Sequence, residues 1–432
     1  MNTKNKTTDN TDFRGIFEYE PDWLYHRRHN SWGTFTDGPL PDRVVHLWRY
    51  TKPEHFLLTD PGILMASRPR ISLDNPIDTL IDSDRYAATA SRSEDNLPQL
   101  EISPELNKTG IIFSDLLSAT VLHNELTEPY LGQLVGSDFG TFEAMNMALW
   151  NDGLFLYIPD NLTVDRPIYL RRRPADFDSA SRLLVIVGRN AEATIIDEYT
   201  AAAGTDGSFN GAVEIFADDY SRVRYVNLQN MPLGYKTYLT ERARIGRETS
   251  LYTIFGGLGS SVAKVNAGTI LTGPGGNSRM YGVVFADGKQ HLDYHTLHHH
   301  RADDSYSNID FKVVLKDKAT SAYTGLIKID QDTRNCEAYQ LNRNLLLNKG
   351  PRAESIPELE ILTDEVRCSH GATMGPIDKE MLFYLMSRGL DRDEAVKTVI
   401  KGFIEPTAAQ LPVGLRETMR RLVLTKLEGQ NQ

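Results

Sequence analysis

Cysteine is scarce in this sequence of 432 residues. Only Cys336 and Cys368 occur, and they lie far apart in the chain. Two such residues exclude a disulfide framework, a cysteine-rich zinc module and a self-contained four-cysteine cluster site. If this protein takes part in metal chemistry, it cannot supply all the ligands alone.

Long apolar runs are missing as well. No uninterrupted stretch approaches the roughly 18 apolar residues of a membrane-spanning helix. The first residues, Met1–Lys6, are polar and lack the apolar core of a secretory signal, so we expect a cytoplasmic protein. Hydrophobic residues make up 40% and charged residues 24% of the chain, which is typical of soluble globular proteins. The formal net charge of −11 argues against non-specific binding to nucleic acid or anionic membranes.

Common catalytic motifs are also absent. The sequence contains no Walker A motif, no Gly-x-Ser-x-Gly elbow and no His-Glu-x-x-His pair. The glycine-rich stretches Gly256–Gly259 and Gly273–Gly276 are not followed by a predicted helix, so we interpret them as turns. We therefore expect a protein that does not hydrolyse nucleotides.

A chain of this length is expected to form two or three domains. Residues 1–150 predict a mixed, partly helical region, with a helix near Phe142–Trp150 that ends in a turn at 151–153. Residues 151–365 are a series of short strand-like runs separated by Gly, Asn and Asp, and residues 366–432 are helical. The predicted strands include Leu154–Pro159, Leu183–Val187, Ala193–Tyr199, Val213–Ala217, Val223–Leu228, Ser250–Phe255, Gly268–Leu271, Tyr281–Phe285, Ile309–Leu315 and Tyr323–Lys328.

Two architectures fit the all-β region. In one run, Ile309, Phe311, Val313 and Leu315 alternate with mostly polar residues, which is the period of a half-buried strand. Such strands build either a β-sandwich or barrel, or a parallel β-helix. A β-helix grows by adding coils, so the length of the region favours it modestly.

The C-terminal region predicts three helices. The first covers 377–388 and is closed by Gly389, and the second opens at a capping box around Asp391 and runs through Phe403. The third covers 414–427. Each carries apolar residues at helical spacing.

Histidines are concentrated between His291 and His300. On a strand His291 and His295 would share one face, and His298 and His300 would share another. Neutral imidazole is a good ligand for iron, zinc or copper, so His298 and His300 are candidate metal ligands. The ordinary alternative is that the histidines join hydrogen-bond networks on a strand or turn, and it is favoured because no carboxylate or cysteine stands at a familiar ligand spacing.

Cys368 and His370 are two residues apart, so on an extended segment both side chains point the same way. A thiolate and an imidazole placed in this way could share a soft metal. The pattern alone favours the simpler interpretation, in which Cys368 is a small buried apolar residue.

Several ordered stretches carry a family resemblance that covers about three quarters of the chain. They are residues 110–116, 142–148, 152–159, 167–168, 321–326, 368–373 and 383–390. From about Gly110 onward the sequence resembles the SufB/SufD family, the scaffold subunits of the SUF iron–sulphur cluster assembly system. SufB-like members carry Cys-Asp-Ser-Leu-Leu where this chain has Asn342-Arg343-Asn344-Leu345-Leu346, and His-Glu-Ala-Thr where it has His370-Gly371-Ala372-Thr373. A chain that lacks both the cysteine and the glutamate resembles the SufD branch.

The resemblance implies a scaffold protein that is not an enzyme, together with a fold and a set of partners. The fold would be an N-terminal helical region, a right-handed parallel β-helix and a C-terminal helical domain. A SufB-like subunit would pair with the β-helix, with Asn342, Cys368 and His370 at the interface, and His370 would serve the nascent cluster. A SufC-like ABC ATPase would dock on the C-terminal helices, for which Met381, Leu385, Val399 and Phe403 are the candidate residues. The cluster would be transient, a reduced flavin would belong only to the complex, and a homodimer is possible without partners.

Two other functions remain as alternatives. One is a β-helical enzyme that acts on polysaccharides, with Asp303, Asp304 and Asp310 as candidate acids, although most such enzymes are exported. The other is a stand-alone metal-binding protein built on the histidines of 291–300.

Overall fold

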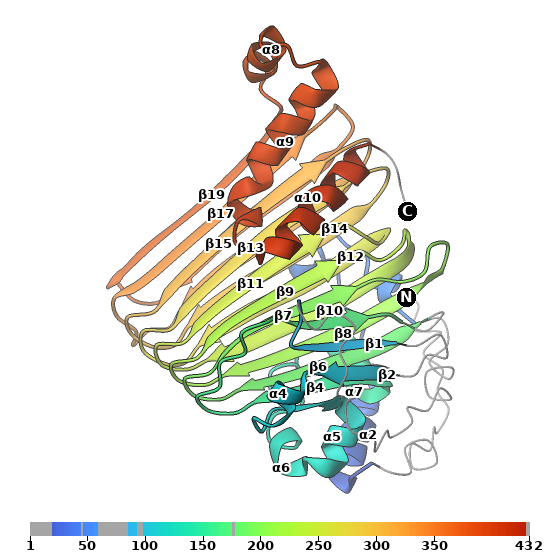
Figure 1. Ribbon diagram of the computed structural model, residues 1–432, viewed down its shortest axis with the longest axis vertical. Helices are drawn as coiled ribbons and strands as arrows, with labels where there is room; N and C mark the ends of the chain where they lie inside the picture. The colour runs from blue at the N-terminus through green and yellow to red at the C-terminus, as the bar shows by residue number, and fades with distance from the viewer. Residues whose placement is uncertain (1–19, 45, 59–84, 93–97, 175–177, 429–432) are drawn as a thin grey trace.

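The computed structural model describes residues 20–44, 46–58, 85–92, 98–174 and 178–428. Its core is a parallel β-solenoid of about eight turns, with helices toward both ends of the chain (Figure 1). Each turn contributes one strand to each of two sheets. The ten-stranded sheet contains β2 (Pro98–Ile102), β1 (Ala88–Arg92), β5 (Ile168–Arg172), β7 (Glu192–Tyr199), β9 (Arg222–Gln229), β11 (Ser250–Gly257), β13 (Asn277–Ala286), β15 (Tyr306–Leu315), β17 (Cys336–Leu346) and β19 (Val366–Pro376). The nine-stranded sheet contains β3 (Ile112–Asp115), β4 (Asp152–Ile158), β6 (Ser179–Val187), β8 (Asp206–Ala217), β10 (Gly234–Ile245), β12 (Val262–Leu271), β14 (His291–His300), β16 (Thr320–Ile329) and β18 (Arg352–Ile361).

The strand register decides between the two architectures. Val262 of β12 pairs with His291 of β14, and His291 pairs with Thr320 of β16, so one turn takes 29 residues here. From β4 to β19 each strand pairs in parallel with the strand one turn away, whereas β1–β2 and β3–β4 are antiparallel. Parallel pairing with a constant offset is the geometry of a β-helix, which confirms the architecture favoured by length.

The turns bend at residues in the left-handed backbone region. These residues have φ between 50° and 73° and are Asn190, Tyr220, Glu248, Gly275, Asp304 and Asn335. Each donates its backbone N–H to a carbonyl one turn further on, as Asn190 does to Asp219 at 3.0 Å and Asn335 to Glu365 at 2.8 Å. Asparagine, aspartate and glycine are the residues that adopt this conformation most readily. The corner therefore continues the backbone hydrogen-bond ladder of the sheets.

Every second residue of each strand faces the interior of the solenoid. Ile309, Phe311, Val313 and Leu315 all lie in the central apolar core, which confirms their predicted alternation. The predicted runs are mostly shorter than the strands. They include none of β1, β2, β3, β5, β10, β14, β17, β18 and β19. In β14 and β17 polar side chains occupy interior positions, so the apolar alternation is broken there.

The N-terminal region covers the outer face of the nine-stranded sheet. Its elements are α2 (Asp22–Asp37), η1 (His46–Trp48), η2 (Pro53–Phe56), α4 (Pro104–Asn107), α5 (Leu116–Leu122), α6 (Asn124–Thr127) and α7 (Thr141–Leu149). Trp48, Phe56 and Phe142 pack with Phe216 and Tyr238 of the sheet. Helix α7 confirms the helix predicted near 142–150, but Asp152 and Gly153 begin β4 instead of forming a turn.

Two of the three C-terminal helices, α9 (Arg392–Ala408) and α10 (Val413–Leu427), cover the outer face of the ten-stranded sheet. The first of the three is α8 (Lys379–Ser387), and Asp378 and Asp391 cap α8 and α9. Ile404 and Met419 pack against Val226 and Phe285 of the sheet. Residues 366–376, which the sequence analysis assigned to the C-terminal helical domain, form the edge strand β19, and the first of the three predicted helices begins at Lys379. No helix in the described part of the chain is both long and apolar enough to span a membrane.

A buried ion pair between β6 and β8 anchors backbone groups of the N-terminal region to the solenoid. Arg182 Nη2 lies 2.9 Å from Glu214 Oε2, and each side chain is 1% exposed. Glu214 also accepts hydrogen bonds from the backbone N–H groups of Gly132, Leu134 and Val135 at 2.7–3.1 Å. Removing one partner of such a pair leaves the other charge buried without compensation.

We therefore expect Arg182→Leu to lower the free energy of unfolding by about 3–5 kcal/mol. Arg189→Leu is the matched control, because Arg189 and its partner Asp160 are largely exposed, and it should cost less than about 1 kcal/mol. Urea denaturation followed by tryptophan fluorescence measures both. Equal losses in the two variants would contradict the role given to the buried pair.

Candidate functional site

The last turn of the solenoid is open. Within the described residues β19 pairs only with β17, and β18 pairs only with β16. Helix α8 projects beyond these strands at the same end of the molecule (Figure 1). One edge of β19 therefore presents backbone N–H and C=O groups that no strand of the described chain uses.

Cys368 and His370 lie on this edge strand and, two residues apart, face the same side. Cys368 is half-buried and packs with Cys336 and Ala338 of β17. Burial, assisted by the neighbouring Cys336, raises the pKa of the Cys368 thiol above its ordinary value, so the thiol is protonated at neutral pH. His370 stands in register with Gln340 and is exposed, because no further turn covers it.

Asn342 lies one strand beneath, in register with Ala372. Its side chain is buried, with 1% exposed. Its Nδ2 donates to the carbonyl oxygen of Phe311 at 3.4 Å, and its Oδ1 accepts from Asn344 Nδ2 at 2.7 Å. Asn342 is thus separated from solvent by β19, whereas Cys368 and His370 lie on β19 itself.

Two interior amides near this end were missed by the sequence interpretation. Gln340 and Asn344 flank Asn342 at interior positions, where the preceding turn has Ile309 and Val313. Both polar atoms of Gln340 are buried and without a hydrogen-bond partner, and Gly325 makes room for the amide, since an added Cβ would lie 2.3 Å from Gln340 Nε2. The amide side chains at every second position, 340, 342 and 344, could have indicated a strand with one polar face. The interior beneath His370 therefore changes from apolar to polar, with unused hydrogen-bonding capacity.

The histidines of β14 are divided between the two faces of the strand, as predicted. His298 and His300 point inward, and His291, His295 and His299 point outward. His298 Nε2 contacts Ser278 Oγ at 3.0 Å, and the two ring nitrogens of His300 contact Ser305 and Ser307 at 2.7 and 2.8 Å. Burial lowers the pKa of His298 to about 3 and that of His300 to about 4, so both are neutral. In the described part of the chain no group of three or more His, Cys, Asp or Glu side chains is arranged to hold a metal.

The candidate docking residues on the C-terminal helices lie in different surroundings. Met381 is exposed, whereas Leu385 and Val399 are half-buried where α8 packs on α9. Phe403 packs on the ten-stranded sheet. Helix α8 also exposes large apolar side chains that were not among the candidates, namely Phe383, Tyr384 and Met386.

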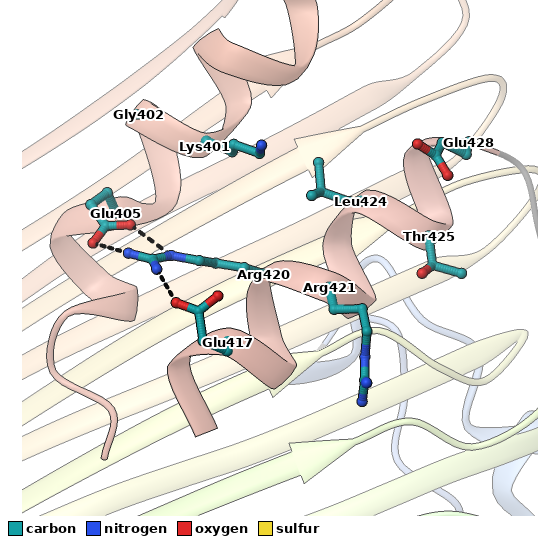
Figure 2. A pocket seen from close by; sticks show the side chains of 9 residues that line it. All are labelled: Lys401, Gly402, Glu405, Glu417, Arg420, Arg421, Leu424, Thr425 and Glu428. Carbon is teal, nitrogen blue, oxygen red and sulfur yellow. Dashed lines mark hydrogen bonds and ion pairs between the residues drawn. The ribbon is translucent and has the colours of Figure 1, made fainter. Parts of the chain in front are cut away.

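An open groove of about 650 Å³ separates α9 from α10 (Figure 2). Arg420 spans it and binds Glu405 through two hydrogen bonds, of 3.1 and 2.5 Å, while Glu417 binds the same guanidinium. These bonds raise the pKa of Arg420. Its charge is compensated inside the groove. Neither this groove nor the hollows beside Leu258 and Lys316 is lined by an aromatic ring on which a flavin could stack, so no residue is assigned to a flavin.

Two of the three candidate acids of a polysaccharide enzyme form hydrogen bonds between successive turns of the solenoid, at the bend after β14. Asp303 Oδ1 accepts the backbone N–H of Arg334 at 2.9 Å, and Asp304 Oδ1 accepts Asn335 Nδ2 at 3.2 Å. Asp310 lies within β15. Two of the three carboxylates are thus used to brace successive turns.

Comparison with known proteins identifies a single family. Residues 171–403 match the family model described as "SUF system FeS cluster assembly, SufBD core domain", and residues 11–170 match "SufBD protein N-terminal region". Similar curated proteins include one from Staphylococcus aureus (strain MRSA252), 29% identical over 421 residues, and one from Staphylococcus saprophyticus, 28% identical over 428 residues. Each comparison covers 95% of this chain and 90% of the relative, and both relatives are named iron–sulfur cluster assembly SufBD family proteins.

The neutral interior histidines predict a dependence of stability on pH. A base whose pKa is lowered by folding contributes stability above its unfolded pKa, near 6.5, and that stability is lost as the pH falls toward the folded pKa. Lowering the pH from 7 to 5 should therefore reduce the free energy of unfolding by up to about 2 kcal/mol for each of His298 and His300.

Urea denaturation at pH 7, 6 and 5 measures this loss. The double variant His298→Asn with His300→Gln should show a flatter pH dependence, whatever its stability at pH 7. The control is His26→Gln, since His26 is exposed, and its slope should match that of the unmodified chain. The prediction is wrong if the free energy of unfolding falls equally with pH in the unmodified chain, the double variant and His26→Gln.

Proposed function

The chain belongs to the SufBD family of iron–sulfur cluster assembly proteins, and we propose that within this system it is a non-catalytic scaffold subunit of the SufD type. The observation that carries the proposal is the position of His370, which is exposed on an unpaired edge strand at the open end of the solenoid. Neutral imidazole at such a place can bind iron or carry a proton.

The chain offers too few ligands to hold a cluster by itself. Cys368 is partly buried, with a raised pKa, and the described residues contain no three-ligand group around His370. A nascent cluster, as the cargo of this protein, would therefore be held jointly with a second subunit. The cluster is transient, and His370 supplies one of its contacts.

Two substitutions relative to SufB-like sequences support the SufD assignment. Asn342 stands at the position of a cysteine, and its amide is buried and hydrogen-bonded. Gly371 stands at the position of a glutamate and brings no side chain to β19. Neither residue can act as a thiolate ligand or as a carboxylate, so these two functions fall to the partner.

The free edge of β19 suits a SufB-like partner that brings a strand of its own. An unpaired edge is a template for strand addition, which satisfies its backbone groups. Such pairing would bring the partner's strand directly beside Cys368 and His370. In the absence of the partner, a second copy of this chain offers the same edge.

Helix α8 suits the docking of a SufC-like ABC ATPase. Phe383 is 74% exposed and Met381 is 49% exposed, and with Tyr384 and Met386 they form an apolar surface. Exposed apolar patches of this kind mark protein interaction sites. Val399 and Phe403 are engaged within the fold, so α8 carries the contact.

His370→Ala should leave the complex with the SufB-like and SufC-like subunits assembled but slow cluster formation about tenfold or more. Anaerobic reconstitution followed by visible absorbance measures the rate, and size-exclusion chromatography measures assembly. Ser369→Ala is the matched control, because Ser369 is exposed on the opposite face of the same strand. Cluster formation at the unmodified rate in His370→Ala would overturn the proposed role.

Phe383→Asp should weaken binding of the SufC-like ATPase by about 30-fold or more, since central aromatic anchors of an interface contribute at least ~2 kcal/mol. Glu380→Gln on the same exposed helix is the control and should change binding little. Isothermal titration calorimetry measures both affinities. Unchanged affinity in Phe383→Asp would exclude α8 as the docking element.

A further inference from the structure

Arginine and tyrosine side chains form a row on the outer face of the ten-stranded sheet. Arg224 of β9, Tyr252 of β11 and Arg279 of β13 are in register on successive strands, and Tyr306 of β15 lies beside Arg279. We call these four residues the arginine–tyrosine row. All four are partly exposed. They lie near the beginnings of their strands, whereas α9 and α10 pack on residues further along, such as Leu228 and Phe285.

The side chains of the row hold one another in place. The guanidinium carbon of Arg224 lies 5.9 Å from the centre of the Tyr252 ring. That of Arg279 lies 5.4 Å from the same ring and 5.3 Å from the ring of Tyr306. Cation–π contacts of this kind restrict long side chains before any partner arrives, which lowers the entropic cost of binding.

The two guanidinium groups differ from Arg222 and Arg367 of the same face in their charge balance. Arg222 lies 3.9 Å from Glu192, and Arg367 lies 3.4 Å from Glu337. Within the described residues, neither Arg224 nor Arg279 forms an ion pair with a carboxylate. The Nε atoms of both are buried without a hydrogen-bond partner. Two uncompensated positive charges thus stand together on a chain of net charge −11.

The spacing of these charges indicates the form of the partner. Arg224 and Arg279 are two strands apart, which corresponds to about 10 Å between their backbones. On an α-helix, carboxylates seven residues apart lie on one face about 10.5 Å from each other. Guanidinium groups bind carboxylates in a bidentate manner, and arginine and tyrosine are among the residues enriched at interface hot spots.

We propose that the arginine–tyrosine row binds an acidic helix of a partner protein, with two carboxylates of the helix on Arg224 and Arg279. Nucleic acid fits this surface less well, because the tyrosine faces already contact guanidinium groups and are not free for bases to stack. The row lies on the side wall of the solenoid, and β15 and β17 separate β13 from β19. The inference is therefore independent of the function proposed for His370.

A helical peptide with two glutamates seven positions apart is the probe, and the same peptide with glutamines is its control. The full-length chain should bind the glutamate peptide about tenfold or more tightly than the glutamine peptide, as fluorescence anisotropy at low salt would measure. Arg224→Gln with Arg279→Gln should abolish this preference. Arg222→Gln should retain it, because Arg222 already has a carboxylate neighbour. Arg279→Lys keeps the positive charge but lacks the planar guanidinium group that binds a carboxylate through two hydrogen bonds. This variant should bind the glutamate peptide several-fold more weakly than the unmodified chain.

The thermal unfolding midpoint of each variant shows whether it is folded. If the double variant does not fold, the peptide affinity of Arg279→Lys tests the proposal in its place. Equal binding of the two peptides by the unmodified chain would overturn the proposal. The proposal would also be overturned if the double variant still bound the glutamate peptide more tightly than the glutamine peptide. Tighter binding of a single-stranded oligonucleotide, or self-association of the chain that competes with the peptide, would assign the row to a different partner and reject the acidic helix.

Discussion

The parallel backbone hydrogen-bond ladder is the interaction on which the rest of this structure depends. It runs through both sheets and through the corner residues such as Asn190 and Asn335, whose N–H groups bond to the next turn. Each turn satisfies the polar backbone of the one before it. The same repetition stacks interior side chains in register, and it leaves the final turn with groups that nothing in the described chain satisfies. The open edge at β19 is thus a direct result of how the core is built.

The helical layers on the two outer faces are attached to the core by buried polar groups as well as by apolar contacts. On the nine-stranded sheet Glu214, paired with Arg182, accepts the backbone N–H of Gly132. Asp293, which lies 2.8 Å from Lys264, accepts a hydrogen bond from Thr51. On the ten-stranded sheet Lys426 of α10 reaches Asp287 at 3.2 Å. Burial of such charges is favourable only when both partners remain in place. These contacts specify where each helical layer lies along the solenoid.

The sequence was most informative where side chains alternate or repeat regularly. The alternation from Ile309 to Leu315, the caps at Asp378 and Asp391, and the shared face of His298 and His300 could all be read directly. Apolar alternation did not identify β14 or β17, because histidines and amides occupy their interior positions. The extent of β19 was also hidden, since an edge strand without a following turn has no need of apolar residues.

The site could be predicted only in part, for a physical reason. Spacing placed Cys368 and His370 on one face, but exposure depends on which turn is last, and that is a property of the whole chain. The role of Ser278, Ser305 and Ser307 as partners of the interior histidines depends on contacts between strands about 20 residues apart or across a corner, which no local pattern reveals.

The packing of α9 and α10 has a consequence for synthesis on the ribosome. Val226, Ile254, Val283 and Phe285 face outward and are covered by residues 400–423, which are made long after the strands themselves. During elongation these strands can stack, but their outer apolar surface stays uncovered until the last helices emerge. Such transiently exposed surface promotes aggregation of nascent chains. Chains truncated before α9 would keep that surface permanently, so the C-terminal helices act as the closing step of biogenesis.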